Sequence, residues 1–542
     1  MVIFLIIQLM YISSMTATQT IPATTPQTNE SFHHRKAMLA RIPPSSLKNL
    51  LLFASLYKNT KEGEEALQQA WSILSPTTIF SSSTPQLPYN FHTLIERLLH
   101  VIEPSYFHHN QYPSIQKETE AFIEKIGENL HHKSLQGHRA HSLSEILTLP
   151  SEEIDISRAV LLLEGEKISH HSTIEASLDL LALEILSTIG KNASSEEKIC
   201  AINNLLFHER GIRFPPKAQL MAKKSAAFSE LSKVLFSKRG VCLGTTIVYL
   251  ALAQRLNLPL IIYTPPGHIF LGNQQKNAVR VIETTARGVH IPIKNYETLS
   301  LRHIPQRSLK EVIGMVLFNK AGSCLQNKNF EQAVSYYQQA ANFYQDYELQ
   351  QMTAFALLLT TSKKQAAKYA KNIQLPTYRL EHDTFVLDIQ SQTLSQDDAS
   401  TLLNFLNIEK TTVLTAIKAL QERASSQSLS IPLHLAHCWL EFGKPKEAIS
   451  ILENLTQNPR IPYSTHCLLA TLYQERMNIE KTWEALLLAL QATEQFGMIP
   501  KKLETMIIEL QISHPCSHKL SLFEQLITKN KKEPCSEKTR SR

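Results

Sequence analysis

The chain has 542 residues, and its 43% apolar and 19% charged residues give a globular composition with enough length for several domains. Only 15 residues are glycine, which disfavours a fold rich in strands and tight turns and favours a mostly helical one. The net charge is +7, and the tail Thr528–Arg542 alone supplies +4 of it, from six basic and two acidic residues. The nearly neutral remainder argues against nucleic-acid binding.

The N-terminus combines features of a leader and of a signal sequence. Val2–Met10 is apolar apart from Gln8 and resembles the core of a secretory signal, but no basic residue precedes it. It is also far shorter than the ~20 residues that cross a bilayer. We predict a leader over residues 1–31, with Met10 or Met15 as alternative starts. A cytoplasmic location is favoured over export, and no later segment is expected to span a membrane.

Helical spacing of apolar residues dominates the first half of the chain. Residues 32–150 are predicted to form a helical N-terminal domain in which no chemistry is recognisable, with helices at Ser46–Tyr57 and Glu62–Leu74. Four further helices are predicted before the next distinctive stretch, at Ile154–Leu163, Ile174–Thr188, Lys198–His208 and Phe228–Phe236.

One cysteine lies where a helix is predicted to begin. Cys242 follows Arg239 and Gly240, and the apolar residues after it mark a helix face that ends near Leu256. Unpaired backbone N–H groups and the helix dipole favour a thiolate at such a position. The same N–H groups can stabilise an oxyanion during acyl transfer.

Strands follow this helix and carry a histidine and an acid. Leu260–Tyr263 is predicted as a strand, His268 opens a second apolar run after a Pro-Pro-Gly turn, and Val279–Glu283 is a third strand. Cysteine, histidine and acid in this order could serve as nucleophile, base and orienting group. Taken singly, each residue has an ordinary structural reading: a buried thiol, a polar turn residue and a solvated charge.

The C-terminal half is predicted to be helical, with a repeat of 34 residues. Ala436 and Ala470, Trp439 and Tyr473, and Leu452 and Leu486 are each 34 apart, at small, aromatic and large apolar positions typical of a tetratricopeptide unit. An earlier copy spans Leu317–Asp346, with Ala321, Ala333, Tyr337 and Ala340 in matching places and Cys324 replacing the first aromatic. A generic helical bundle is the alternative, since alanine and leucine occur at these spacings in any helix pair.

The absence of several sequence motifs argues against several kinds of functional site. The seven cysteines form no CxxC pair, so free thiols are expected rather than a zinc ribbon or a thioredoxin motif. The adjacent histidine pairs lack zincin spacing and are interpreted as surface residues, so no metal site is predicted. Nucleotide-binding glycine motifs and the GxSxG motif are absent. We expect no cofactor.

The central segment resembles the N-terminal transglutaminase-like domain of the SirB family, in the transglutaminase and papain-like superfamily. The resemblance covers about a quarter of the chain and is carried by Ala201–Phe207, Leu231–Leu235, Arg239–Gly244, Tyr249–Leu256 and Pro266–Leu271. It implies a papain-type fold with Cys242 as nucleophile and His268 as base. The third residue of that superfamily is usually Asp, whereas Glu283 stands at the fitting position here, and Asn273 or Asn277 are alternatives. Many family members carry Ile-Pro where Val241-Cys242 stand, so the fold does not guarantee activity.

These observations predict an α+β, predominantly helical protein. Its expected parts are the leader 1–31, a helical domain 32–150, a transglutaminase-like domain 151–308, tetratricopeptide-like repeats 309–527 and a basic disordered tail 528–542. The predicted function is cysteine-dependent acyl transfer, as a peptidase, amidase or transamidase, with the helical repeats binding a protein partner. The alternatives are an inactive fold that serves as an interaction scaffold, and a regulatory thiol that senses oxidants.

Overall fold

The computed structural model describes residues 32–75, 87–88, 91–102, 116–165, 168–216, 228–265, 267–275, 278–291, 304–373, 384–405, 413–423, 427–493 and 499–515. The predicted leader and basic tail lie outside these ranges. The chain divides into two compact units, one of Met1–Pro292 with Pro305–Val316 and one of Ile293–Ile304 with Leu317–Arg542. The described elements are mostly helices and include one small sheet, in agreement with a predominantly helical α+β protein.

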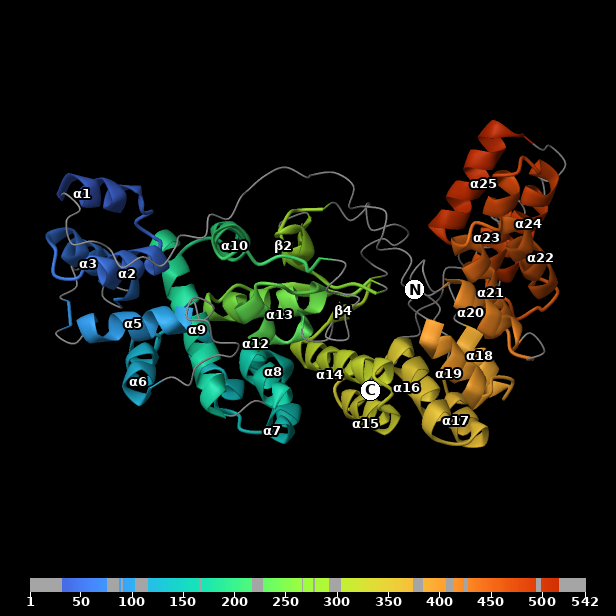
Figure 1. The fold of residues 1–542 in the computed structure, drawn as a ribbon, viewed down its shortest axis with the longest axis horizontal. Helices are drawn as coiled ribbons and strands as arrows, with labels where there is room; N and C mark the ends of the chain where they lie inside the picture. The colour runs from blue at the N-terminus through green and yellow to red at the C-terminus, as the bar shows by residue number, and fades with distance from the viewer. Residues whose placement is uncertain are drawn as a thin grey trace. The chain divides into compact units, whose positions relative to one another are not determined.

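The first unit has eleven complete helices among its described residues, labelled in part in Figure 1, and a helix lies at each of the individually predicted places. They are α1 (Phe32–Arg41), α2 (Leu47–Leu56), α3 (Lys61–Leu74), α5 (Phe91–Ile102), α6 (Lys117–Ile126), α7 (Leu143–Thr148), α8 (Ile156–Glu164), α9 (Ile168–Ile189), α10 (Ser195–Asn203), α12 (Leu231–Ser237) and α13 (Cys242–Arg255). The helix expected at Lys198–His208 is divided into two parts. The α-helix α10 ends at Asn203, and a wider π-helical turn continues over Asn204–Glu209. Helix α14 (Leu309–Gln326) begins in the first unit.

The sheet of the first unit is antiparallel throughout, with the order β3-β2-β1-β4. Its strands are β1 (Ile261–Tyr263), β2 (Phe270–Gln274), β3 (Val279–Ile282) and β4 (Gln306–Arg307). Leu271 pairs with Ile282, so the start of β2 and the end of β3 lie at the same edge of this hairpin. The three expected strands are confirmed, whereas the two-residue β4 is too short to show a periodic pattern.

Helix α13 runs through the core of the first unit and packs on α8, α9, α10 and α12. Every residue from Leu243 to Ala253 is buried, which explains why the helix is apolar on all sides rather than amphipathic. A side chain at Gly244 would meet the carbonyl oxygen of Phe228 at 2.2 Å, so the segment leading into α12 can approach this closely only because residue 244 is glycine.

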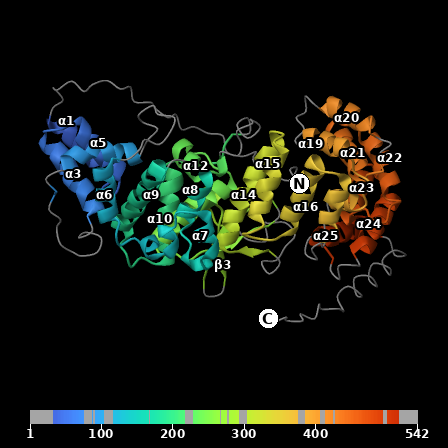
Figure 2. The same ribbon diagram turned by 90° about the horizontal axis from the view of Figure 1, so that it is seen from below.

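The second unit is helical in its described residues. After the rest of α14 come α15 (Phe330–Ala340), α16 (Tyr347–Thr360), α17 (Lys363–Ala370), α18 (Thr384–Gln390), α19 (Gln396–Phe405), α20 (Val413–Gln421), α21 (Ser430–Glu441), α22 (Pro445–Leu455), α23 (Tyr463–Gln474), α24 (Ile479–Thr493) and α25 (Lys501–Ser513). Helices α21 to α24 pack consecutively (Figure 2). The spaced residues Ala436, Ala470, Leu452 and Leu486 all lie in one shared hydrophobic core.

Two further findings concern the whole described part of the chain. Within those ranges, no helix combines the length and the apolar character that crossing a bilayer requires. The described cysteines are all free thiols: Cys200, Cys242, Cys324, Cys438 and Cys467. Cys200 is exposed, Cys242 and Cys324 are half-buried, and the other two are buried.

Candidate active site

Cys242 is the first residue of α13, as the sequence predicts. Val241 before it has extended backbone angles and no capping side-chain bond. The first backbone N–H groups of a helix have no acceptor inside that helix, and the helix dipole places partial positive charge there. The half-buried thiol of Cys242 therefore lies at a helix start, beside backbone N–H groups that have no acceptor within the helix.

His268 is placed by a tight turn just before β2. Gly267 adopts a φ of +71°, a left-handed conformation that glycine reaches without strain. The His268 N–H then donates to the carbonyl of Pro265 at 3.0 Å, which fixes the direction in which the side chain leaves the turn. The imidazole is mostly buried, with 22% of the side chain exposed.

Glu283 directly follows β3, at the edge of the hairpin where β2 begins. Its Oε2 lies 2.7 Å from Nε2 of His268, and Oε1 accepts from the Thr285 N–H at 3.0 Å and from the Thr285 hydroxyl at 2.6 Å. The side chain is only 4% exposed. Both carboxylate oxygens are therefore bound, and the carboxylate has one firmly set orientation toward the imidazole.

The imidazole also interacts with the thiol. Burial lowers the pKa of His268, but hydrogen bonds to Cys242 and Glu283, together with their charges, outweigh burial and raise this pKa to about 10. Because Nε2 faces Glu283, Nδ1 is the ring nitrogen left for the sulfur. The structure thus brings Cys242, His268 and Glu283 together, with the imidazole in the middle.

The alternative third residues lie elsewhere. The Asn273 amide is buried on β2 and donates to the carbonyl of Pro259 at 3.5 Å. Asn277 lies outside the described residues. Glu283 is therefore the predicted acid that bonds to His268.

Three threonine hydroxyls form a second connection that sequence reasoning missed. Thr284, at the start of the 3-10 turn η8 (Thr284–Ala286), lies 3.1 Å from the hydroxyls of both Thr245 and Thr246 in the first turns of α13. This cluster ties the helix that carries Cys242 to the residue next to Glu283. The signal was visible only as two Thr-Thr pairs, one shortly after Cys242 and one directly after Glu283.

One sequence interpretation is wrong. The histidine pairs were expected on the surface, and His33 and His34 are exposed, but His132 is fully buried and His171 is 3% exposed. Nε2 of His132 lies 3.2 Å from the buried carboxylate of Asp179. A carboxylate partner distant in sequence can hold a histidine inside a core, and spacing within the sequence cannot reveal such a partner.

Comparison with known proteins supports the reading of the central segment. No curated protein matches the chain. A protein-family model does match, over residues 172–313, and this range includes Cys242, His268 and Glu283. Residues 172–313 therefore form a domain of the transglutaminase-like superfamily.

Proposed function

We propose that this protein catalyses cysteine-dependent acyl transfer on an amide, with Cys242 as nucleophile, His268 as base and Glu283 as orienting acid. The supporting observation is the 2.7 Å bond between His268 and the buried Glu283, on an imidazole that also interacts with the thiol at the start of α13. A papain-like fold of the SirB type is part of this proposal, and the match of residues 172–313 to the transglutaminase-like superfamily supports its coarser, transglutaminase-like part.

The proposed reaction has two halves: Cys242 is first acylated by the amide, and the resulting thioester is then cleaved by water or a second amine. With the proton of the pair already on His268, the sulfur of Cys242 attacks the amide carbon to form a C–S bond, and the π electrons of the carbonyl move onto its oxygen. As the C–N bond breaks, the imidazolium returns its proton to the leaving amine, which leaves a thioester. Water or a second amine then gives a proton to His268, attacks the thioester and releases Cys242 as the leaving group.

The carboxylate of Glu283 and the N–H groups at the start of α13 would lower the activation barriers for forming and for cleaving the thioester. The carboxylate stabilises the imidazolium and keeps Nε2 turned away from the sulfur, so the remaining nitrogen is available to the reaction. The N–H groups at the start of α13 can donate to the oxyanion of each tetrahedral intermediate. Such donors are already oriented before reaction, which avoids a cost of reorganisation in the transition state.

The C-terminal helices fit a role in binding a protein partner. The 34-residue spacing places buried small residues Ala436 and Ala470 in helices α21 and α23, in the manner of tetratricopeptide pairs. Repeats of this kind present long surfaces to other proteins. The second candidate function follows from this unit alone, as an interaction scaffold whose transglutaminase-like domain is inactive.

Alkylation of each thiol in the folded protein, followed against pH by peptide mass spectrometry, tests the proposal. We expect Cys242 to react rapidly below pH 7 and to slow in His268→Ala. Cys200 is exposed and serves as the ordinary reference thiol in the same sample. A Cys242 that reacts no faster than Cys200 across the pH range, in both wild type and variant, favours the inactive scaffold.

A further inference from the structure

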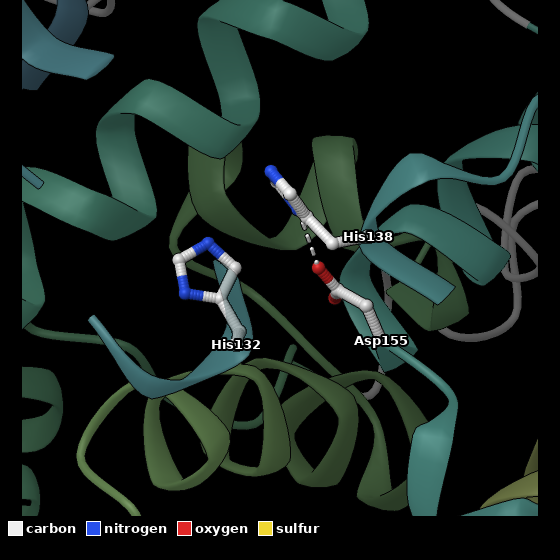
Figure 3. A group of neighbouring side chains, drawn as sticks. All are labelled: His132, His138 and Asp155. Atoms are coloured by element: carbon white, nitrogen blue, oxygen red, sulfur yellow. Dashed lines mark hydrogen bonds and ion pairs between the residues drawn. The ribbon is translucent and has the colours of Figure 1, made fainter. Parts of the chain in front are cut away.

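A second group of ionisable side chains lies in the first unit, away from the thiol. His132, His138 and Asp155 each offer one ligand atom, and these atoms all lie within 4.8 Å of one another (Figure 3). The two imidazole rings are 4.9 Å apart between centroids and nearly perpendicular. We propose that these three residues form a binding site for a divalent transition-metal ion, and that Zn²⁺ is the ion that fits it.

The backbone around the cluster is built for close approach. His132 and His138 come from two short 3-10 turns, η3 (His131–Ser134) and η4 (Gln136–Arg139). A side chain at Gly137 would meet the backbone nitrogen of Asp155 at 2.5 Å, so η4 can lie directly against the start of α8 only because residue 137 is glycine. The two turns and the start of α8 are therefore packed as one unit.

Asp155 has one oxygen committed to the helix and one facing the cluster. Its Oδ1 accepts from the N–H groups of Ser157 and Arg158 and so caps α8. Its Oδ2 lies 3.1 Å from Nδ1 of His138, which is the dashed contact in Figure 3. Two ligands of a tetrahedral zinc ion are roughly 3.3 Å apart, given bonds of about 2.0 Å. These two donor atoms therefore already have the spacing that a shared ion requires.

The imidazole of His132 has a ring nitrogen that the described residues leave without a hydrogen bond. It is fully buried; Nε2 lies 3.2 Å from the Asp179 carboxylate without hydrogen-bond geometry, and Nδ1 has no hydrogen-bond partner within the described residues. An unsatisfied buried polar group costs about 1–3 kcal/mol.

The nearby cations are already paired. Nε of Arg255 lies 2.7 Å from the Asp179 carboxylate, and Nζ of Lys133 lies 3.2 Å from it. Asp155 supplies the carboxylate of the proposed site through Oδ2, the oxygen that faces His138. Two imidazoles and one carboxylate, with a fourth position for water, are a ligand set that zinc accepts.

The test uses the full chain carrying Cys242→Ala, so that zinc cannot bind the thiol. After chelation and dialysis, calorimetric titration with Zn²⁺ is expected to show one equivalent bound, and His138→Gln is expected to weaken binding by at least ~100-fold. His138 is suited to substitution because its side chain is 12% exposed, whereas Asp155 caps a helix. His131→Gln is the matched control, since His131 is exposed and lies in η3, directly before the proposed ligand His132.

A second measurement keeps the proposal open to contradiction if His138→Gln folds poorly. Co²⁺ added to the Cys242→Ala protein is expected to give the intense visible absorption of a tetrahedral site, and Zn²⁺ is expected to displace it. The proposal is overturned if no zinc binds, if His138→Gln binds zinc as tightly as its parent, or if Co²⁺ shows only the weak spectrum of the hydrated ion.

Discussion

Helix α13 has an imidazole near each of its ends, and the pKa values of the two imidazoles are shifted in opposite directions. At the first residue, Cys242, the neighbouring His268 has its pKa raised to about 10. At the last residue, Arg255, the neighbouring His132 has its pKa lowered to about 4. The ring of His132 is fully buried and that of His268 is mostly buried, and each lies beside a carboxylate, so burial alone does not decide the direction of the pKa shift.

The difference comes from the third group at each end. Beside His268 the third group is a thiol, which can become an anion and favours the imidazolium together with Glu283. Beside His132 the third group is the guanidinium of Arg255, which already neutralises Asp179 and disfavours a second cation. The helix dipole supports both arrangements, because it favours an anion at the N-terminus and a cation at the C-terminus.

The largest loss of stability is expected from removing the guanidinium of Arg255, which pairs with Asp179. Arg255→Met would leave the carboxylate of Asp179, which is 2% exposed, without its closest partner. Breaking one side of a buried ion pair typically costs about 3–5 kcal/mol of unfolding free energy. Urea unfolding measures it, and Arg97→Gln is the control, since Arg97 pairs with the exposed Glu118 and should cost under about 1 kcal/mol. Equal costs for both variants would contradict the account.

The next effect is a dependence of stability on pH. The folded pKa of His132 is depressed, so the unfolded chain binds its proton first, and stability falls as pH decreases from about 6.5 to about 4. The pKa shift of His132 corresponds to a loss of about 3 kcal/mol of unfolding free energy between these pH values. His132→Gln should show a flatter unfolding free energy across this window. An unchanged slope would show that His132 keeps its ordinary pKa.

The opposite sign is expected for His268. Its folded pKa is raised, so its contribution to stability is fully present below about pH 6.5 and is lost as pH rises toward about 10. His268→Gln should remove the alkaline part of the slope and leave the acid part intact.

Removing only the charge of Glu283 is expected to slow the alkylation of Cys242. Glu283→Gln keeps the length of the side chain but loses the carboxylate that stabilises the imidazolium. We expect the alkylation rate of Cys242 at pH 6 to fall about 10²-fold, in the range of acid–base contributions in enzymes. Glu311→Gln is a control outside this site. An alkylation rate unchanged by Glu283→Gln would show that the carboxylate of Glu283 does not influence the reactivity of Cys242.

The smallest effect is expected at the threonine cluster. Thr284→Val keeps the shape of the side chain but removes the hydroxyl that Thr245 and Thr246 contact. Loss of one such bond should cost about 1 kcal/mol of unfolding free energy. The alkylation rate of Cys242 should also fall, by a few-fold, because the start of α13 is less firmly tied to the acid. A change in stability with no change in rate would make the cluster purely structural.

The sequence was informative where chemistry follows local pattern. The helix beginning at Cys242, the strands around His268 and the acid after β3 could all be predicted, because apolar periodicity and a Pro-Pro-Gly turn are local features. Arg255 and His132 could not be interpreted correctly, since their partner Asp179 lies on α9, far away in sequence. In isolation, Arg255 looks like an ordinary solvated charge at a helix end.

The most direct test of the account is an NMR titration of the imidazoles in the full chain, with assignments from His268→Gln and His132→Gln. We predict that His268 remains an imidazolium at pH 8 and that His132 remains neutral at pH 5.5. In Cys242→Ser, the pKa of His268 should fall, because the anion that stabilises the imidazolium is lost. If both histidines titrate near pH 6.5, and Cys242→Ser changes neither, the thiol and the guanidinium do not set the character of these two rings.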